Sequence, residues 1–529
     1  MSRGPRVATP PTKPVASHRE LASRLTGWLL GRPFVTSSYA ISRWLFLRAL
    51  GVIFLAAFLS LGCQVRGLIG HAGILPVDRL MAALRQAYDG SGIGIDRFRL
   101  VPTLSWLSSS DRLLGFECVA GVALAIALAL GLVQRWALVL LWVLYLSLVV
   151  VGREFFAFQW DNLLLETGLL AAFLAPAGWQ ARRSVTRTAP ALALWLPRLL
   201  LFKLMLSSGC VKLTSGDSSW HALTALAYHY QTQPLPTWPA WFANRLPLWW
   251  HRLSCAAMFA IELGAPWLIF SPRRLRHLGC ALMVGLQALI LLTGNYAFFN
   301  LLTLGLCLLL LDDAFWRRWL PAAWFHRLGV DTPETAPSAR HCRSVAAVAV
   351  VFVPISLAQV LASAGVRPAA LGPVTAVDAW LSPIRTINGY GLFAVMTTER
   401  NEIIVEGSRD GSTWLPYAFK HKPGDVQHRP AFVAPHQPRL DWQMWFAALG
   451  SYRDNRWFVS FCVRLLQGSP AVSRLLAHDP FAGQPPRYVR AELYRYDFTE
   501  SAERRASGAW WTQTRLGQYL PPISLANLR

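Results

Sequence analysis

The stretch WLFLRALGVIFLAAFLSLG, residues Trp44–Gly62, decides the fold class of this chain. A helix needs about 20 mainly apolar residues to cross the hydrocarbon core of a bilayer, and this stretch carries a single charged side chain, Arg48. The whole sequence agrees, because its 529 residues are 54% hydrophobic and only 15% charged, too apolar for an ordinary soluble enzyme. We therefore predict an integral membrane protein.

Further apolar stretches follow along the chain and predict a polytopic α-helical bundle of about nine spans. The fourth and eighth stretches are short, which suits partial or re-entrant helices covered by protein. The predicted spans are Trp44–Gly62, Leu114–Leu132, Trp136–Val151, Asn162–Pro176, Leu194–Val211, Cys255–Phe270, Leu278–Thr293, Ala297–Leu311 and Val345–Ala364.

The arginines orient the predicted bundle, because short cytoplasmic loops are enriched in Lys and Arg. Arginine clusters precede the first and ninth spans and follow the fourth and sixth, and Arg135 follows the second, which places all of them on one side. We expect the N-terminus inside and the C-terminal part outside. The net charge of +23 then reflects topology, so we expect no nucleic-acid partner. The first outer loop runs against the trend with Arg66, Arg79, Arg85, Arg97 and Arg99.

Three parts follow from this pattern. Residues 1–43 are a basic lead that we expect to be disordered and cytoplasmic, residues 44–364 form the bundle, and residues 377–529 form a non-cytoplasmic terminal domain. Cys462 is the only cysteine of that domain, which must therefore be held by a packed core rather than a disulfide.

Local patterns in the terminal domain predict a small mixed α+β fold. A β-branched run followed by turn residues predicts a hairpin, and alternating side chains predict another strand. The predicted strands are Glu402–Glu406, Trp414–Phe419 and Tyr488–Phe498, and the predicted helices are Arg439–Leu449 and Asn455–Leu466.

Long motifs in both halves resemble the lipase maturation factor family. The terminal domain carries NGYGLFAVMTTERNEIIVEGSRDGSTWLPYAFKHKPGD (Asn388–Asp425) and RPAFVAPHQPRLDWQMWFAALG (Arg429–Gly450). The membrane half carries FLRALGVIFLAAFLSLGCQVRGLIGHAGILPV (Phe46–Val77), FQWDNLLLETGLLAAFLAP (Phe158–Pro176) and LMLSSGCVKLTSGDSSWHALTALAYHYQTQPLPT (Leu204–Thr237). The resemblance extends from about Ser42 to the C-terminus.

The resemblance implies an assembly factor rather than a catalyst. Animal members reside in the endoplasmic reticulum membrane and assist folding and assembly of dimeric lipases, with the terminal domain implicated in client contact. The predicted topology independently places this domain on the equivalent side. Few lysines, many arginines and abundant alanine suit a GC-rich bacterial genome, so we expect a bacterial inner membrane, a periplasmic terminal domain, and an exported lipase or other secreted client as partner.

Aromatic and arginine side chains anchor protein interfaces, which gives a set of candidate client contacts. A place in the domain core is the plainer interpretation for most of the tryptophans, although two adjacent ones are hard to bury together. The candidates are Trp414, His436, Arg439, Trp442, Trp445, Trp510 and Trp511.

A catalytic role for the terminal domain has little support. His436 and Asp441 stand close in the segment PHQPRLDW, but no GxSxG elbow accompanies them, and the prolines favour a structural loop. His421, His428 and His436 lack zinc-site spacing, and we expect neither a metal nor a cofactor.

The membrane half holds the alternative function. The segment SSGCVKLTSGDSSW, Ser207–Trp220, weakly resembles the stretch bearing an essential lysine in membrane enzymes similar to the vitamin K-dependent carboxylase. On that resemblance the chain is an enzyme acting on a lipid or quinone-like substrate, with Lys212 as base and Asp161 or Glu166 beside it in a buried cavity.

Ion pairing between spans is the competing explanation of these charges. In it, Glu166 or Glu262 neutralises Arg198 or Lys203 and holds helices together. A polar cavity containing Lys212 and an acid favours the enzyme, whereas paired charges favour the maturation factor.

Overall fold

The computed structural model describes residues 38–176, 178, 189–328 and 336–527. Most of the predicted N-terminal segment, residues 1–37, lies outside the described residues. Within the described ranges, seven helices are long and apolar enough to cross a membrane. They are α2 (Ala40–Gly62), α6 (Asp111–Leu130), α7 (Gln134–Val151), α9 (Ala191–Thr214), the continuous run of α13 (Leu248–Phe259), η5 (Ala260–Gly264) and η6 (Ala265–Phe270), α14 (Arg273–Thr293) and α18 (Ala339–Ser363).

The two stretches predicted to be short are also short helices. α8 (Gln159–Leu174) has 16 residues, and α15 (Phe299–Leu308) is followed at a bend of 100° by α16 (Asp313–Trp319). All nine predicted stretches are thus helical, while the described bundle has seven full spans, or eight if the bent pair is one. α17 (Ala322–Leu328) follows the bent pair.

Close backbone contacts place α2 inside the bundle. It contacts α6, α8 and α15, and it buries Phe54 and Phe58 completely. A Cβ atom on Gly51 would lie 2.5 Å from the backbone nitrogen of Ala129 in α6, so only glycine allows this approach. Small residues at helix contacts are typical of membrane bundles, where packing rather than water exclusion drives association.

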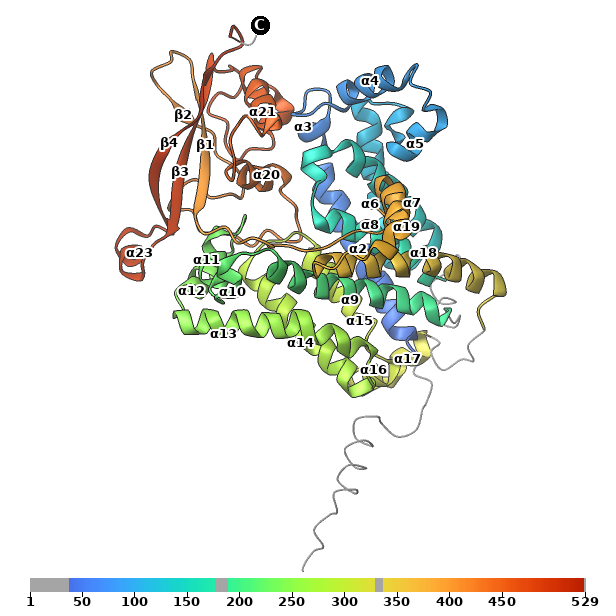
Figure 1. Ribbon diagram of the computed structural model, residues 1–529. Helices are drawn as coiled ribbons and strands as arrows, with labels where there is room; N and C mark the ends of the chain where they lie inside the picture. The colour runs from blue at the N-terminus through green and yellow to red at the C-terminus, as the bar shows by residue number, and fades with distance from the viewer. Residues whose placement is uncertain (1–37, 177, 179–188, 329–335, 528–529) are drawn as a thin grey trace, which may run out of the picture.

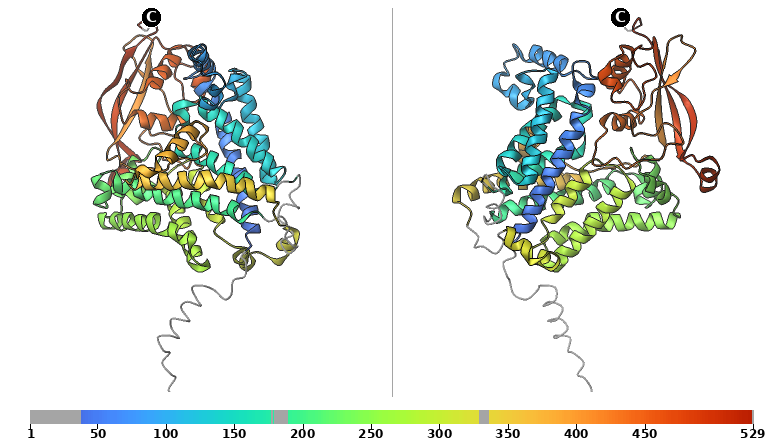
Figure 2. Two further views of the ribbon diagram at one scale, coloured as in Figure 1. Left: turned by 45° about the vertical axis from the view of Figure 1, so that its right-hand side comes forward. Right: turned by 180° about the vertical axis from the view of Figure 1, so that it is seen from behind.

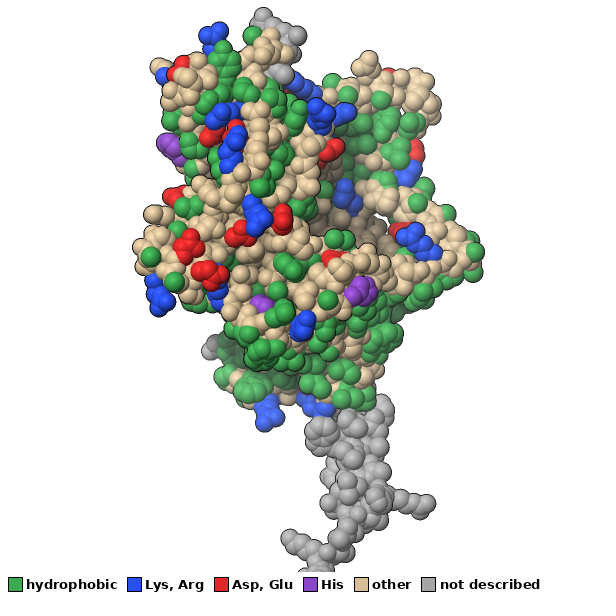
Figure 3. All heavy atoms as spheres, turned by 60° about the vertical axis from the view of Figure 1, so that its left-hand side comes forward, with side chains coloured by type: hydrophobic (Ala, Val, Ile, Leu, Met, Phe, Trp, Pro, Cys, Tyr) green, Lys and Arg blue, Asp and Glu red, His purple; other side chains and the backbone are tan. Residues whose placement is uncertain are grey.

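An apolar band covers the face of the bundle that Figure 3 shows. Figure 3 shows hydrophobic side chains gathered beneath the charged terminal domain, with Lys and Arg along the lower border of the band. Its members on α13 and α14 include the exposed side chains Trp249, Leu253, Leu289 and Leu292. Such exposure is stable only against lipid, and the tryptophan is typical of an interfacial belt.

Short helices from the predicted outer loops gather on the side of the terminal domain (Figures 1 and 2). Four of these loops bond to it, through Gly73, Phe155, Trp241 and Asn295. The elements are α3 (Val65–Ile69), α4 (Val77–Tyr88), η1 (Gly94–Asp96), α5 (Arg97–Leu100), η2 (Leu104–Trp106), η3 (Arg153–Phe156), α10 (Ser218–His221), α11 (Ala225–Thr232), α12 (Trp238–Asn244), η7 (Ala369–Leu371), α19 (Gly372–Leu381) and η8 (Ser382–Ile384).

The terminal domain is an antiparallel four-stranded sheet in the order β2-β1-β3-β4. Its strands are β1 (Arg400–Ser408), β2 (Leu415–Pro416), β3 (Tyr488–Phe498) and β4 (Trp511–Ile523). The predicted hairpin pairs Gly407 with Leu415, and Ile403 pairs with Leu493 across the two central strands. The prediction did not include β4, in which Gly517 and two prolines interrupt the alternation.

Helices cover the face of the sheet that points toward the bundle (Figure 1). α20 (Arg439–Ala447) and α21 (Arg456–Leu466) confirm the predicted helices within two residues at each end. The apolar face of α21 is buried, with Phe458 and Phe461 fully enclosed. α22 (Pro470–Ser473) and α23 (Ser501–Ser507) complete the domain.

Candidate functional site: the domain junction and the cavity beneath it

A buried ion pair fixes the terminal domain on the bundle. Arg439, at the first position of α20, is 1% exposed and Asp161 in α8 is fully buried. The guanidinium donates to both carboxylate oxygens at 2.7 and 2.8 Å and to the carbonyl of Phe155 at 2.7 Å. Tyr145 donates to the same carboxylate at 2.5 Å. A bidentate pair with these further bonds is the geometry in which buried charges are tolerated.

Glu166 joins a second contact one turn further along α8. Lys203 of α9 donates to one carboxylate oxygen at 2.6 Å, which makes an ion pair between spans. The other oxygen accepts from the hydroxyl of Tyr390 at 2.6 Å and the backbone of Asn388 at 2.9 Å. The acid therefore binds its neighbouring span and the segment entering the terminal domain at once.

A cavity of about 390 Å³ lies beside these contacts, between α9, α13, α14 and α15. Most of its wall is apolar, with side chains such as Leu204, Met258 and Leu286. A small number of polar groups on an apolar wall is the usual composition of a small-molecule site.

Lys212 and Glu262 form an ion pair on the cavity wall. The ammonium donates to both carboxylate oxygens, at 2.9 and 2.7 Å, and to the carbonyl of Ser208 at 3.0 Å. Each donor of Lys212 thus has a partner. Glu262 lies in the π-helical turn η5, a local distortion that is frequent at functional sites.

His229 of α11 lines the cavity on the side of the terminal domain. Burial, reinforced by Lys212, lowers the pKa of His229 to about 4, so its imidazole is neutral near pH 7. Its Nε2 lies 3.1 Å from the hydroxyl of Tyr296, which donates to Gln233 at 2.8 Å. Its other ring nitrogen is buried without a hydrogen-bond partner.

Two amide side chains lie deeper in the cavity wall. Asn300 of α15 is 1% exposed and donates to Gln287 of α14 at 2.8 Å, while its carbonyl oxygen has no partner. An unsatisfied buried acceptor costs free energy unless a donor reaches it. The cavity therefore offers a hydrogen-bond acceptor within an apolar environment.

The comparisons with known proteins follow the same two-part organisation. Residues 41–318 match the lipase maturation factor transmembrane domain, and residues 386–521 match the lipase maturation factor C-terminal domain. The chain belongs to the lipase maturation factor family. The predicted resemblance is thereby confirmed.

Curated members of the family align with almost the whole chain. Lipase maturation factor 2 of Gallus gallus is 37% identical over 92% of this chain and 82% of its own length. Lipase maturation factor 1 of Bos taurus is 36% identical over 95% and 92%, and lipase maturation factor 2 of Homo sapiens is 35% identical over 92% and 83%. No solved structure matches the chain.

The predicted client contacts lie mainly where the family's C-terminal domain meets the bundle. Trp442 packs edge-on against Trp160 of α8 at 4.7 Å, and Trp445 donates to the carbonyl of Thr232 at 2.8 Å. Both are buried, as is Arg439. Trp414 is half-buried, with the guanidinium of Arg490 4.2 Å from its ring centre.

Trp510 and Trp511 are both buried, at 7% and 2% exposure, although their adjacency favoured exposure of one of them. Trp510 packs against Trp241 of α12, whereas Trp511, the first residue of β4, stacks on Phe498 at 4.3 Å. The chain enters a strand at this point, so consecutive side chains point to opposite faces and each finds its own neighbour.

His436 lies in the structural loop that the prolines predicted, whereas Asp441 lies in the first turn of α20. The carboxylate of Asp441 accepts the backbone N–H groups of His421 and Lys422 at 2.8 and 2.9 Å. Burial, with a smaller effect of His421, lowers the pKa of His436 to about 4.

The predicted pairing of intramembrane charges is confirmed for Glu166 with Lys203 and wrong for Arg198. Arg198 donates instead to the carbonyl of Leu309, which the bend after α15 leaves free of helical bonding. Glu262 pairs with Lys212, a partner that was not predicted for it, and the predicted place of Asp161 or Glu166 beside Lys212 is wrong because neither acid lines the cavity. Gln287 and Asn300 were missed, although amides within apolar stretches are a signal of buried polar contacts.

Proposed function

We propose that the protein is a membrane-anchored maturation factor that assists an exported client, such as a lipase, through its terminal domain. Family membership and the rigid seating of that domain on the bundle by Arg439 and Asp161 support this role. A domain fixed at the membrane can hold a client that has just left the translocation machinery. Most of the charged side chains within the spans form ion pairs, which favours a scaffold over a catalyst.

We also propose that the terminal domain faces the non-cytoplasmic side, the periplasm of a bacterium and the equivalent of the endoplasmic reticulum lumen. The arginine-rich border opposite that domain supports this orientation. Cysteine labelling tests it, because Cys63 and Cys342 are exposed. On a Cys342→Ser background, a membrane-impermeant maleimide added to intact cells labels Cys63 if the orientation is right. Labelling of Cys342 alone, in the Cys63→Ser variant, would overturn it.

Crosslinking tests the maturation role. The full chain, and a chain ending near residue 376, are expressed in cells that export a lipase, crosslinked and purified. The full chain retains an exported protein that the truncated chain loses, and secreted lipase activity falls with it. Unchanged lipase secretion and no crosslinked exported protein would contradict the proposal.

A second candidate function comes from the cavity, which holds Lys212 and an acid at membrane depth. It is an enzyme acting on a lipid or quinone-like substrate, in which Lys212 leaves Glu262 to serve as base. The ion pair opposes this role, because it engages the lysine ammonium with a carboxylate. The test is mass spectrometry of lipids extracted from the purified protein and from a Ser254→Trp variant that fills the cavity. A molecule retained only by the native cavity favours the enzyme, and identical extracts oppose it.

A further inference from the structure

A groove lined by arginines separates the terminal domain from the first outer loop. Its volume is about 630 Å³, and its walls are α4 and the preceding loop, η3, and α21 with the turn before it. Five arginines line it, namely Arg79, Arg153, Arg453, Arg456 and Arg464. Arg79 is one of the loop arginines that run against the charge trend of the topology.

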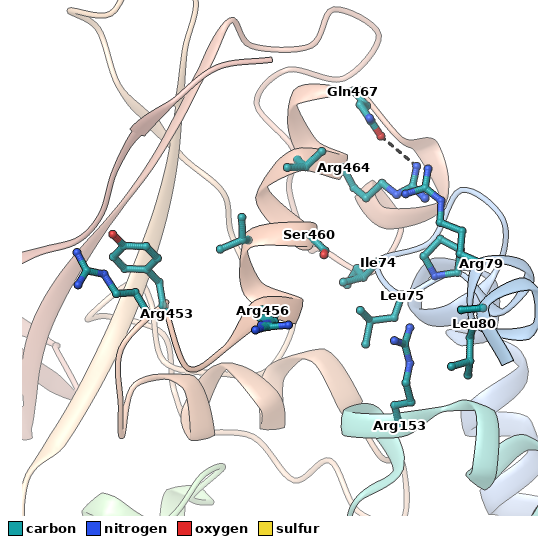
Figure 4. Close-up of a pocket in the computed structure, with 15 residues that line it drawn as sticks. Ile74, Leu75, Arg79, Leu80, Arg153, Arg453, Arg456, Ser460, Arg464 and Gln467 are labelled. Carbon is teal, nitrogen blue, oxygen red and sulfur yellow. Dashed lines mark hydrogen bonds between the residues drawn. The ribbon is translucent and has the colours of Figure 1, made fainter. Parts of the chain in front are cut away.

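The guanidinium groups place five like charges along one groove. Figure 4 shows the side chains of Arg79 and Arg464 meeting at one end, and Arg153 rising from below into the space between them and Arg456. Arg453 lies at the opposite end of the groove, beside Tyr452. Burial lowers the pKa of Arg464, and the charge of Arg79 adds to this effect.

Hydrogen bonds to uncharged groups hold Arg464 in place, and backbone strain marks Arg153. Arg464 donates to the carbonyl oxygens of Gly73 at 2.7 Å and His71 at 3.1 Å, which joins α21 to the outer loop. Arg153 has a φ of 46°, a conformation rare for residues with a side chain, and its Nε is buried with no partner. Strained residues of this kind concentrate at functional sites.

Two carboxylates near the groove have partners outside it. Asp78 pairs with His71 at 2.7 Å, and Asp454 accepts the hydroxyl of Ser451 at 2.6 Å. Glu154 follows Arg153 and is exposed, and it lies outside the groove lining. Within the described residues no carboxylate forms an ion pair with any of the five arginines.

Some other arginines of the same domain do form ion pairs with carboxylates, in contrast to the five in the groove. Arg490 binds Glu406 at 2.8 Å, and Arg515 binds Glu492 at 2.6 Å. Like charges brought together without a counter-ion repel and are destabilising. Their retention in one groove points to an anionic partner from outside the chain.

The floor of the groove is apolar between the arginines. Ile74 and Leu75 form it, flanked by the half-buried side chains of Leu80, Val459 and Val463. An occupant that satisfies both features carries carboxylates and apolar side chains on one face. A lipid phosphate would supply the charge but would leave the apolar floor uncovered.

We propose that this groove binds an acidic amphipathic segment of a client protein. The inference rests on the proposed maturation role and names the surface and the chemistry through which the client is held. Guanidinium groups on both walls bind the carboxylates of the segment through paired hydrogen bonds. The apolar floor between the walls packs against the apolar side chains of the segment and so orients it.

Binding of a synthetic peptide to the full-length protein tests the proposal. The protein is placed in nanodiscs of phosphatidylcholine, and fluorescence anisotropy reports binding of a helical peptide with glutamates and leucines on one face. A peptide with every glutamate replaced by glutamine is the control for charge. We expect the acidic peptide to bind at least about tenfold more tightly, with an advantage that falls as salt shortens the Debye length.

Variants locate the binding surface. Arg79→Gln combined with Arg456→Gln changes two exposed groove residues, so folding is retained, and adding Arg153→Gln removes a third charge. Arg409→Gln with Arg505→Gln removes the same charge from exposed sites outside the groove and is the matched control. The groove variants lose about tenfold or more in affinity for the acidic peptide, a difference of about 1.4 kcal/mol, and the control keeps it.

Four outcomes would overturn the inference. Equal affinity for the two peptides, or equal loss in the groove and control variants, removes the groove as the binding surface. If the protein loses peptide binding in nanodiscs that contain phosphatidylglycerol, and if its binding to vesicles of that lipid depends on the groove arginines, the groove binds lipid. A chain with the groove variants that still crosslinks its exported client shows that the maturation role stands while this surface does not carry it.

Discussion

Replacing Arg439 by alanine is expected to release the terminal domain from the bundle. The change removes four side-chain hydrogen bonds, two of them to the fully buried carboxylate of Asp161. Tyr145 still donates to that carboxylate, but no cation remains against it. Removing one partner of a buried pair costs about 3–5 kcal/mol, because the other charge is left uncompensated.

Cys462 is the reporter for this loss. It is the only cysteine of the terminal domain and is fully buried in α21, where burial raises the pKa of its thiol. Such a thiol reacts only when the packing of the domain itself opens, and that opening becomes easier once the domain loses its contacts with the bundle. At about 1.4 kcal/mol for each factor of ten, Arg439→Ala raises the rate of Cys462 alkylation at least about a hundredfold. Peptide mass spectrometry measures the rate in nanodiscs without denaturant.

Two matched variants make the test decisive. Arg495→Ala removes an arginine from a half-exposed pair with Asp497, which should cost below about 1 kcal/mol. Asp161→Leu with Arg439→Met removes both charges and should recover most of the protection. If Arg439→Ala accelerates alkylation no more than Arg495→Ala does, the ion pair does not fasten the domain.

Three further predictions concern other parts of the molecule. Because the pKa of His229 is about 4 in the folded chain and 6.5 ordinarily, the unfolded chain binds more protons between these values. The folded chain therefore keeps its full stability above pH 6.5 and loses roughly 3 kcal/mol of its free energy of unfolding as the pH falls toward 4. The melting temperature of His229→Asn should accordingly depend less on pH than that of the unchanged chain. Lys212→Met or Glu262→Gln alone should each lower the melting temperature, because each leaves a buried charge without its partner. Combining Lys212→Met with Glu262→Leu should restore the melting temperature. If the two effects on stability simply add in the combined variant, the residues do not pair directly. Gly67→Ala would set a Cβ 2.5 Å from a backbone oxygen of α22 and should cost about 1–3 kcal/mol in thermal denaturation, while Gly115→Ala, with only a flexible side chain at 3.7 Å, should be tolerated.

Regular apolar and alternating patterns made most of the fold predictable. The span Trp44–Gly62, the short fourth and eighth stretches and the helix Arg456–Leu466 all follow from hydrophobic periodicity, because burial against one face or against lipid sets that pattern. The last strand was missed because Gly517 and the prolines near its end break the alternation that identifies strands.

The site was less predictable because its contacts join distant segments. Asp161, Glu166 and Lys212 were recognised as costly charges within apolar sequence, yet their partners depend on helix rotation and on loops that no local pattern fixes. The groove arginines come from three segments, and in the sequence only Arg79 stood out, by its departure from the charge trend.

The separation along the chain between Asp161 and Arg439 has a consequence for synthesis. The two residues are 278 positions apart. At typical elongation rates of about 5–20 residues per second, Arg439 is therefore synthesised roughly 14–56 s after Asp161. During that interval the carboxylate stands in a nearly complete bundle with only a tyrosine hydroxyl as donor. The terminal domain, translated last, thus supplies the cation that neutralises the carboxylate of Asp161 in the earlier bundle. A nascent chain that stops before this domain keeps an unpaired buried carboxylate, which membrane quality-control systems can detect.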